Sequence, residues 1–431
     1  MAKHEKIKSK HLVLYQETFS TSKFMACRCF MQMKAHFVIC TPPERKFQFY
    51  SPFCRITINT LKLCLLLFAT IFVIIPIIFK YSVGLQRGIL FITFIAYPRN
   101  LDYTKPSSIG LYATRNFYVK VKDPDDTEVN IGVWHILPIQ IAKRFSKELK
   151  LTEEEEKDVL NSTEISDPHL DKMEPILKSE FPVVTELNEK LFYERILGQS
   201  GTIVLYLHGN TASRGLGYRV ELYKVLRKLG YHVITLDYRS YGDSDKVSPT
   251  EEGVVRDALS VYNYLRNLTN NPVFLWGHSL GSGVSTHLLS LLNKRDIPGP
   301  RAVVLESPFT NIRDAVTKHP FAKLFRHLPW IDYTIAKPMY ENSLRFESDQ
   351  HISEFRQPVL ILHAEDDLVV PFHLGYKLYR TALDNRGRSW GPVEFHRFEA
   401  TSKYGHKFLC RAPNLPEIVK KFVDTYREEI Y

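Results

Sequence analysis

The sequence predicts an α/β fold in which a mostly parallel sheet is covered by helices on both faces. From residue 202 onward, short runs of Val, Ile and Leu alternate with stretches of helical periodicity. Near-continuous apolar runs are typical of parallel strands that are buried on both faces. Two strands of alternating polarity precede this series, so we place the folded domain at residues 116–431. The predicted strands are 117–122, 129–136, 202–207, 232–236, 273–276, 302–305, 359–362 and 393–398.

Two segments interrupt the regular alternation of strands and helices. Residues 140–190 contain an acidic run, polar clusters and no strong core pattern. We interpret them as a partly helical surface insertion. Residues 309–356 are rich in proline and aromatic residues, which favours a helical lid over one edge of the sheet.

The charge of the chain is unevenly distributed. The formal net charge is +10, yet residues 1–62 alone contain 11 Lys or Arg and only 3 Asp or Glu. The remaining residues are therefore close to neutral, which argues against a nucleic-acid-binding domain. We interpret residues 1–62 as a basic cytosolic tail.

An uncharged apolar run follows this tail at residues 63–79, between Lys62 and Lys80. As a helix its 17 residues would span roughly 25 Å, which is at the short end of what a bilayer requires. Pro76 would kink the end of the helix, as lipid-embedded helices tolerate. A buried core helix is the alternative, but such helices rarely lack polar residues on every face. We expect one transmembrane helix, followed by a juxtamembrane segment at residues 80–115.

The basic residues before this span favour a cytosolic N-terminus and a domain in the lumen of the endoplasmic reticulum or outside the plasma membrane. Glycosylation sequons at Asn161 and Asn267 agree with this orientation, although such sequons also arise by chance. Residues 83–97 form a second apolar stretch, which would return the domain to the cytosol if it crossed the bilayer. Its Gln86 and Arg87 favour a segment that lies on the bilayer surface.

The sequence Gly277-His278-Ser279-Leu280-Gly281 matches the motif G-x-S-x-G. It follows a predicted strand and precedes a helical pattern, which is the context of a nucleophile elbow. An abrupt turn from strand to helix strains the serine backbone and leaves little room at the flanking positions, where glycine fits. Ser279 is therefore the predicted nucleophile.

A serine hydroxyl becomes reactive only when a base takes its proton and an acid orients that base. We expect the acid where the strand at 359–362 ends, because the carboxyl ends of parallel strands share one edge of the sheet. Three acidic residues occur there. Asp367 is the predicted acid, Asp366 is the second choice, and Glu365 is more remote.

The base is expected in the loop after the last strand, and His406 lies there, before the closing helix. His396 lies inside that strand and is better explained as a packed side chain, whereas His373 belongs to the helix after the acidic loop. No group of His, Cys, Asp and Glu has metal-ligand spacing, so neither a metal nor an organic cofactor is predicted.

An oxyanion formed at the substrate carbonyl requires preorganised N–H donors. One donor is expected to be the backbone N–H of Leu280, directly after the nucleophile. The other is expected in the turn after the strand at 202–207, where His208 and Gly209 precede two residues that offer an N–H. Asn210 is the preferred donor there, and Thr211 is the next.

With these motifs the chain resembles the α/β-hydrolase superfamily and, within it, a membrane-anchored group with lysophosphatidylserine lipase and monoacylglycerol lipase activities. The resemblance covers roughly residues 116–431 and the preceding span, and it implies a triad of Ser279, Asp367 and His406 that hydrolyses single-chain acyl glycerolipids. Residues 140–190 are longer than expected for the group. The narrower resemblance rests on LYLHGNTASRG from Leu205, RVELYKVLRKLGYHV from Arg219, WGHSLGSGVST from Trp276, LESPFTNIRDA from Leu305 and LILHAEDDLVVPF from Leu360.

These observations predict a serine lipase that takes a lipid substrate from the bilayer, with its headgroup and any protein partner left open. Phe321, Phe325 and Trp330 of the lid are candidates for an acyl path, and core packing explains them equally well. An acyl-protein thioesterase is the alternative that a cytosolic domain would favour. A membrane interaction protein that kept the fold without catalysis is a third interpretation.

Overall fold

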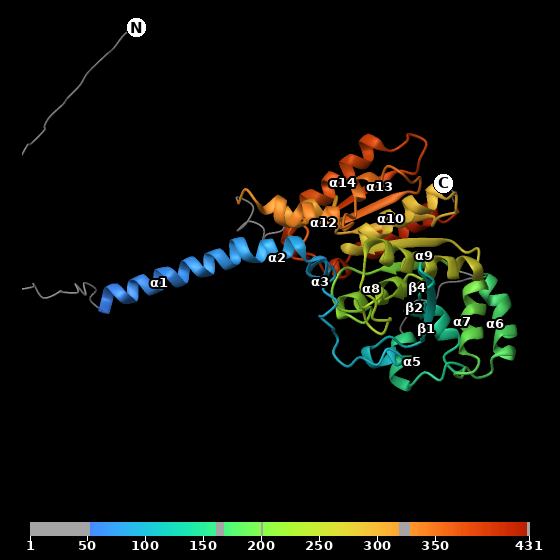
Figure 1. Cartoon of the computed structure of the whole chain (residues 1–431). Coiled ribbons are helices and arrows are strands. Elements are labelled where there is room, and N and C mark those ends of the chain that lie inside the picture. The colour runs from blue at the N-terminus through green and yellow to red at the C-terminus, as the bar shows by residue number, and fades with distance from the viewer. Residues whose placement is uncertain (1–51, 161–167, 200, 319–327, 429–431) are drawn as a thin grey trace, which may run out of the picture. The chain divides into compact units, whose positions relative to one another are not determined.

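The computed structural model describes residues 52–160, 168–199, 201–318 and 328–428 (Figure 1). Most of the predicted basic tail lies outside the described residues, as do Asn161, Phe321 and Phe325. The chain divides into two units, residues 1–60 and residues 61–431. The second unit contains all the strands and helices discussed below except the start of the first helix.

An eight-stranded sheet with the order β1-β2-β4-β3-β5-β6-β7-β8 forms the centre of this unit. The pairs β1–β2 and β2–β4 are antiparallel, and every other pair is parallel. The predicted α/β fold class with a mostly parallel sheet is therefore confirmed. The strands are β1 (Thr114–Lys122), β2 (Glu128–Ile136), β3 (Ile203–Leu207), β4 (His232–Leu236), β5 (Val273–His278), β6 (Ala302–Glu306), β7 (Val359–Ala364) and β8 (Val393–Phe398).

Helices cover both faces of the sheet, and this is why all residues of β3 to β7 are buried. One face carries α8 (Gly217–Lys228) and α15 (Leu415–Tyr426). The opposite face carries α9 (Glu251–Leu268), α10 (Leu280–Lys294) and α14 (Phe372–Asn385) (Figure 1). The edge strand β1 alternates between buried and exposed residues, as expected where one side of a strand faces water.

The segment predicted as a surface insertion contains α4 (Ile139–Arg144), α5 (Glu153–Leu160) and α6 (Pro168–Glu180), and α7 (Glu189–Gln199) follows it. Although its sequence shows no strong core pattern, the segment contributes residues to a core. Apolar residues of this segment and of α7 form a separate buried cluster at the β1 end of the sheet (Figure 1). They are spread over several short helices, so no single stretch shows a long apolar period. The fully buried members include Phe145, Leu177, Phe192 and Ile196.

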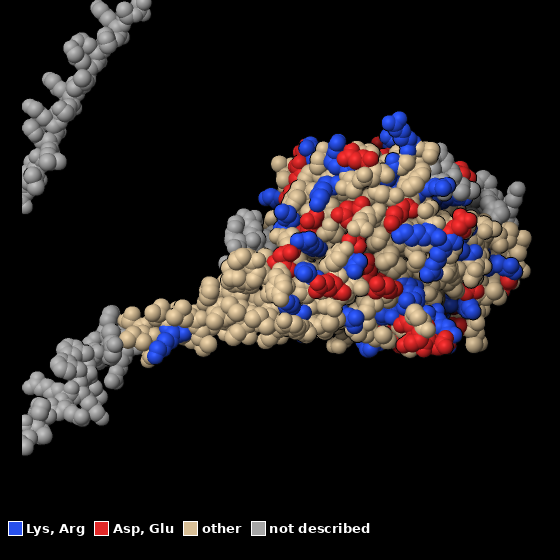
Figure 2. Space-filling view, turned by 45° about the horizontal axis from the view of Figure 1, so that its top comes forward, with Lys and Arg blue, Asp and Glu red and all other residues tan. Residues whose placement is uncertain are grey.

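The apolar run before the domain forms α1 (Pro52–Ala69), a π-helical turn (Thr70–Ile74) and α2 (Ile75–Tyr81). Among the described residues this is the one helix long and apolar enough to cross a membrane. The candidate span covers 25 residues, Thr57–Tyr81, with a mean hydropathy of 2.7 and only 6% of its apolar window buried. It is longer than the predicted 63–79. Figure 2 shows few charged side chains along it, whereas Lys, Arg, Asp and Glu are interspersed on the visible face of the domain.

The lid segment contains α11 (Ile312–Lys318), a π-helical turn (Asp332–Ala336), α12 (Lys337–Glu341) and α13 (Ser348–His351). It contacts the end of the candidate span. Pro76 has no N–H to donate to the carbonyl four residues earlier, which is that of Phe72. The indole Nε1 of Trp330 donates to this carbonyl at 2.7 Å. In addition, Lys80 Nζ lies 3.2 Å from the centroid of the Tyr333 ring.

Residues 83–97, predicted to lie on the bilayer surface, pack partly into the domain. They contain α3 (Val83–Phe91), whose residues Gln86, Leu90 and Phe91 are buried. Leu85 and Ile89 of the same helix are exposed. The core of the domain thus begins before the predicted boundary at residue 116. Because α3 carries apolar residues on its exposed face as well as on its buried face, the sequence does not show which of them pack against the domain.

Candidate active site

Ser279 stands between β5 and α10 in a strained backbone conformation, with φ 53° and ψ −117°. A Cβ at Gly277 would collide with the carbonyl of Gly281, and a Cβ at Gly281 would collide with the carbonyl of Leu207. These close approaches explain why glycine occupies both positions. The N–H of Ser279 donates to the carbonyl of Glu306 at 2.9 Å, which fastens the elbow to the end of β6. The geometry is that of a nucleophile elbow.

Asp367 and His406 come together although 39 residues separate them. His406 Nδ1 lies 2.7 Å from Asp367 Oδ2, and both side chains are largely buried. The other carboxylate oxygen, Oδ1, accepts hydrogen bonds from the N–H groups of Val369 and Val370, each at 2.8 Å. Burial alone would raise the pKa of Asp367, but the charge of His406 and the hydrogen bonds from His363 and His406 outweigh it and hold this pKa well below its usual value. Asp367 is therefore ionised and oriented toward His406.

The two other acidic residues in this loop have different partners. Asp366 accepts from the N–H of Gly405 at 3.1 Å, so it holds the backbone of the loop that carries His406. Glu365 accepts from the N–H of Ala400 at 3.1 Å and lies 3.3 Å from Arg397. Of the three carboxylates considered from the sequence, Asp367 is the one in contact with the His406 ring.

His278, inside the elbow motif, supports the loop of His406 from the other side. Its Nε2 donates to the carbonyl of His406 at 2.9 Å, and the two rings lie 4.9 Å apart between centroids. Burial, together with the nearby His406, holds the pKa of His278 well below its usual value, so this ring is neutral. His278 therefore acts as a neutral hydrogen-bond donor between the elbow and the base.

Residues 208–213, here called the oxyanion turn, follow β3 and lie against the nucleophile. A Cβ at Gly209 would be 3.1 Å from the Cβ of Ser279, so this position tolerates only a very small residue. The N–H of Thr211 already donates to the carbonyl of Phe91 at 3.4 Å. In this conformation Thr211 is thus excluded as a donor, and Asn210 and Leu280 remain the expected donors.

Arg219 of α8 braces the oxyanion turn from beneath. Its fully buried guanidinium donates to three carbonyls of the turn. A guanidinium is suited to this task because its five N–H groups form a rigid fork. The acceptors are the carbonyls of Ser213 at 2.7 Å, Gly209 at 3.1 Å and Thr211 at 3.0 Å.

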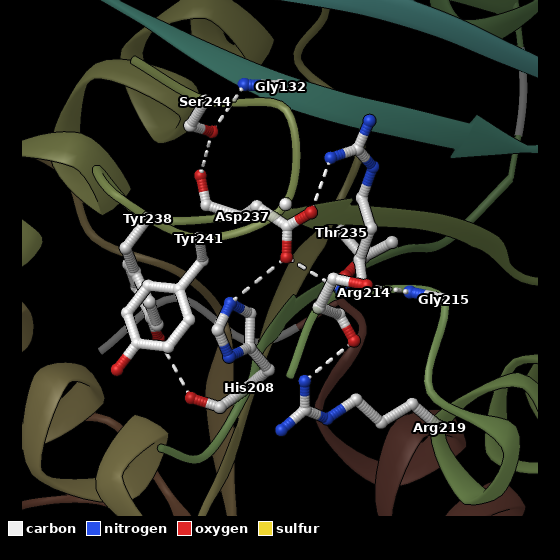
Figure 3. A network of polar contacts seen from close by, with 12 residues as sticks. Gly132, His208, Arg214, Gly215, Arg219, Thr235, Asp237, Tyr238, Tyr241 and Ser244 are labelled. Atoms are coloured by element: carbon white, nitrogen blue, oxygen red, sulfur yellow. Dashed lines mark hydrogen bonds and ion pairs between the residues drawn. The ribbon is translucent and has the colours of Figure 1, made fainter. Parts of the chain in front are cut away.

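A buried ion pair closes the turn on its other side (Figure 3). Asp237, which directly follows β4, accepts from the N–H of Arg214 at 2.6 Å and from its guanidinium at 2.5 Å, and lies 3.4 Å from His208 Nε2. Burial would raise the pKa of Asp237, but the charge of Arg214 and the hydrogen bond from His208 outweigh this and lower it. The carboxylate stays ionised and ties both ends of the turn to β4.

Glu306 places a second buried carboxyl near the site. It ends β6, accepts a hydrogen bond from the indole Nε1 of Trp276 at 2.8 Å, and repels the charge of Asp367. Burial is the main reason that the pKa of Glu306 rises to about 7. Near neutral pH this carboxyl is therefore partly protonated, which limits the negative charge beside Asp367. Within the described residues no group of three or more His, Cys, Asp or Glu could hold a metal ion.

Sequence reasoning missed Arg219, Asp237 and the supporting role of His278. Asp237 had a usable signal, because it directly follows a predicted parallel strand, where functional side chains collect. Arg219 had none, since an arginine in an amphipathic helix ordinarily faces water.

The sheet order, the strained elbow and the His406–Asp367 pair define the class of the α/β-hydrolases, and this fold family matches residues 202–316. Mouse (Mus musculus) lysophosphatidylserine lipase ABHD12 is 37% identical over 367 residues, which cover 85% of this chain and 80% of the relative. The zebrafish (Danio rerio) protein of the same name is 37% identical over 354 residues, covering 82% and 81%. Human protein ABHD12B is 38% identical over 233 residues, covering 54% and 63%. The chain belongs to the ABHD12 family of α/β-hydrolases.

Proposed function

We propose that this protein is a membrane-anchored serine hydrolase that cleaves acyl esters of single-chain glycerolipids, with lysophosphatidylserine, monoacylglycerol or both as substrates. The observation that carries the proposal is the 2.7 Å contact between His406 and Asp367, in a domain that also holds Ser279 on a strained elbow. The name of the mouse relative, lysophosphatidylserine lipase, supports the lipid class.

In the proposed reaction His406 Nε2 takes the proton of Ser279 while the serine oxygen attacks the ester carbonyl. Asp367 holds the opposite ring nitrogen, Nδ1, in its protonated form, which leaves Nε2 as the base. The N–H groups of Leu280 and Asn210 stabilise the oxyanion. His406 then gives its proton to the departing glycerol oxygen. Water, deprotonated by the same histidine, attacks the acyl-enzyme and releases the fatty acid, while His406 returns the proton to the departing Ser279 oxygen.

The membrane helix supports a lipid substrate for a physical reason. A single-chain lipid resides in a bilayer, and an enzyme held at the bilayer surface meets it at a high local concentration. The juxtamembrane segment that follows the span also has exposed apolar residues. Ile89 is 53% exposed and Phe94 is 75% exposed. These side chains favour close contact between the domain and the lipid surface.

The nucleophile is tested with an alkyl fluorophosphonate, which modifies activated serines. Wild-type protein in membranes is expected to be labelled at Ser279, and Ser279→Ala serves as the blank. Because Ser282 lies three residues further along the chain and donates to the carbonyl of Ser279, Ser282→Ala is the matched control and should still be labelled. If wild type remains unlabelled at Ser279, the protein is not a serine hydrolase.

A second assay decides the substrate class. Protein shown to react with the fluorophosphonate is incubated separately with lysophosphatidylserine, monoacylglycerol and an S-acylated peptide. We expect turnover of the two glycerolipids and little of the thioester. Preferred turnover of the thioester would establish the acyl-protein thioesterase alternative. Negligible turnover of all three by a protein that is labelled would reject these substrates while leaving the serine chemistry intact.

We also propose that the N-terminus is cytosolic and that the domain lies in the lumen of the endoplasmic reticulum or outside the cell. Support comes from the basic residues before the span. Asn267, at the last turn of α9, is exposed and can reach a glycosyltransferase. Endoglycosidase treatment is expected to shift the mobility of wild type, and Asn267→Gln with Asn161→Gln should abolish the shift. An unchanged mobility in wild type would remove this support for a lumenal domain.

A further inference from the structure

The oxyanion turn is held by a segment that lies far earlier in the chain. Residues 92–97 follow α3 and run beside the turn. Three consecutive N–H groups of the turn donate to carbonyls at the end of α3 and in this segment. These hydrogen bonds are Thr211 to Phe91 at 3.4 Å, Ala212 to Ile95 at 3.2 Å and Ser213 to Tyr97 at 3.3 Å.

Two side chains add to this backbone contact, one from the turn and one from the loop after β4. Asn210 Nδ2 donates to the carbonyl of Leu90 at 3.1 Å. The hydroxyl of Tyr241 donates to the carbonyl of Phe91, which thus accepts from two groups. The Phe91 side chain is fully buried, and its ring lies 6.3 Å from that of Phe346, between centroids. The end of α3 is therefore part of the buried core of the domain.

The backbone on both sides of this contact is strained. Ile92 adopts the left-handed region with φ 48°, and Thr211 and Ala212 do so with φ 71° and 55°. Residues with a Cβ, and β-branched residues above all, rarely occupy this region. Such conformations persist where surrounding contacts over-determine them, and they collect at functional sites. Here the surrounding contacts are the hydrogen bonds between the two segments.

Gln86 links the same helix to the membrane helix and to the lid. Its buried amide Nε2 donates to the carbonyls of Phe79 at 2.9 Å and Lys80 at 3.1 Å. Its Oε1 accepts from Asn342 Nδ2 in the lid at 2.8 Å. One side chain thus joins the end of the membrane helix, α3 and the lid.

We propose that α3 and residues 92–97 are a positioning element of the active site, which holds the oxyanion turn in its catalytic conformation and ties it to the end of the membrane helix. This inference rests on the proposed function. Three residues are positioning residues because they act through the turn, the membrane helix or the lid and do not touch the reacting ester. They are Gln86, Phe91 and Tyr241. The anchor of this protein is then a structural part of its active site as well as an attachment to the membrane.

The test compares two substitutions on α3 in the full-length chain in detergent micelles. Phe91→Ala removes the buried ring that fixes the end of α3, where the carbonyl of Phe91 accepts from Thr211, and Ile89→Ala is the matched control on the exposed face. Hydrolysis of p-nitrophenyl butyrate, a soluble short-chain ester, is measured per serine titrated with a fluorophosphonate. Phe91→Ala is expected to lower kcat by about tenfold or more and to change KM by less than about twofold, because a displaced donor acts mainly in the transition state. Ile89→Ala should change neither.

Tyr241→Phe provides a second, conservative variant, since it removes one hydroxyl and keeps the ring. It is expected to lower kcat in the same sense by about threefold. The proposal is overturned if kcat per titrated serine is equal in wild type and both variants. This includes the case in which Phe91→Ala yields less active protein but leaves the kcat of each titrated serine unchanged. It is also overturned if Ile89→Ala loses as much as Phe91→Ala. A wild type that neither reacts with the fluorophosphonate nor hydrolyses the ester would instead refute the proposed function.

Discussion

Asp367→Asn is expected to lower kcat by about 10⁴-fold while the domain stays folded. The reason lies in the two N–H groups of Val369 and Val370 that donate to Oδ1. An asparagine must keep its carbonyl oxygen there to accept them, so its NH₂ group would face His406. The amide would then donate to Nδ1 and move the ring proton to Nε2, where it blocks the base.

This prediction is checked by measuring kcat on p-nitrophenyl butyrate together with thermal unfolding. Glu365→Gln is the matched control, because it neutralises a carboxylate in the same loop that contacts Ala400 and Arg397 instead of the base. We expect little change in that variant. A smaller loss in Asp367→Asn than in Asp366→Asn would move the role of the orienting acid to Asp366.

Arg219→Met is expected to destabilise the domain by about 3 kcal/mol and to lower kcat as well. Methionine fills a similar volume but cannot donate a hydrogen bond, so the carbonyls of Gly209, Thr211 and Ser213 would lose a common buried donor. Burying a carbonyl without a hydrogen-bond donor lowers the free energy of unfolding, which explains the loss of stability. The turn can then reorient toward other donors, which explains the lower kcat. The loss should appear as a lower midpoint of thermal unfolding, followed by tryptophan fluorescence.

Two further variants test whether the loss comes from hydrogen bonding, from the loss of charge, or from any substitution on α8. Arg219→Lys keeps the charge but presents a single ammonium, which cannot match the fork geometry, so an intermediate loss is expected. Lys228→Met, on the exposed end of the same helix, should leave stability nearly unchanged. Equal stability of wild type and Arg219→Met would contradict the bracing role of this arginine.

The fold class and the motif-bearing positions could be predicted because each depends on local sequence. The strands β3 to β7 are mainly apolar runs, as expected for parallel strands that are buried on both faces, whereas the edge strand β8 also contains charged residues. Asp367 and His406 could be paired in advance because each follows a parallel strand, and the carboxyl ends of these strands share one edge. Their catalytic roles, with that of Ser279, remain predictions for the experiments above.

The contacts of similar neighbouring residues required the tertiary structure. The sequence ranks Asp367 before Asp366, and the direction of each side chain shows that Asp367 contacts the imidazole whereas Asp366 contacts the backbone of Gly405. The same holds for Thr211, whose N–H is taken by the carbonyl of Phe91. Backbone hydrogen bonds in loops follow no periodic pattern, so the sequence offers no signal for them.

The sequence by itself determined the chemistry of this protein: an α/β sheet, a serine elbow, a following acid and histidine, and an apolar span before the domain. Only the tertiary structure decided what holds that chemistry in place. Arg219 beneath the turn, Asp237 beside it and α3 against it all act through contacts between distant segments. The physical reason is that periodicity records which face of an element is buried, whereas partner identity depends on how the elements pack together.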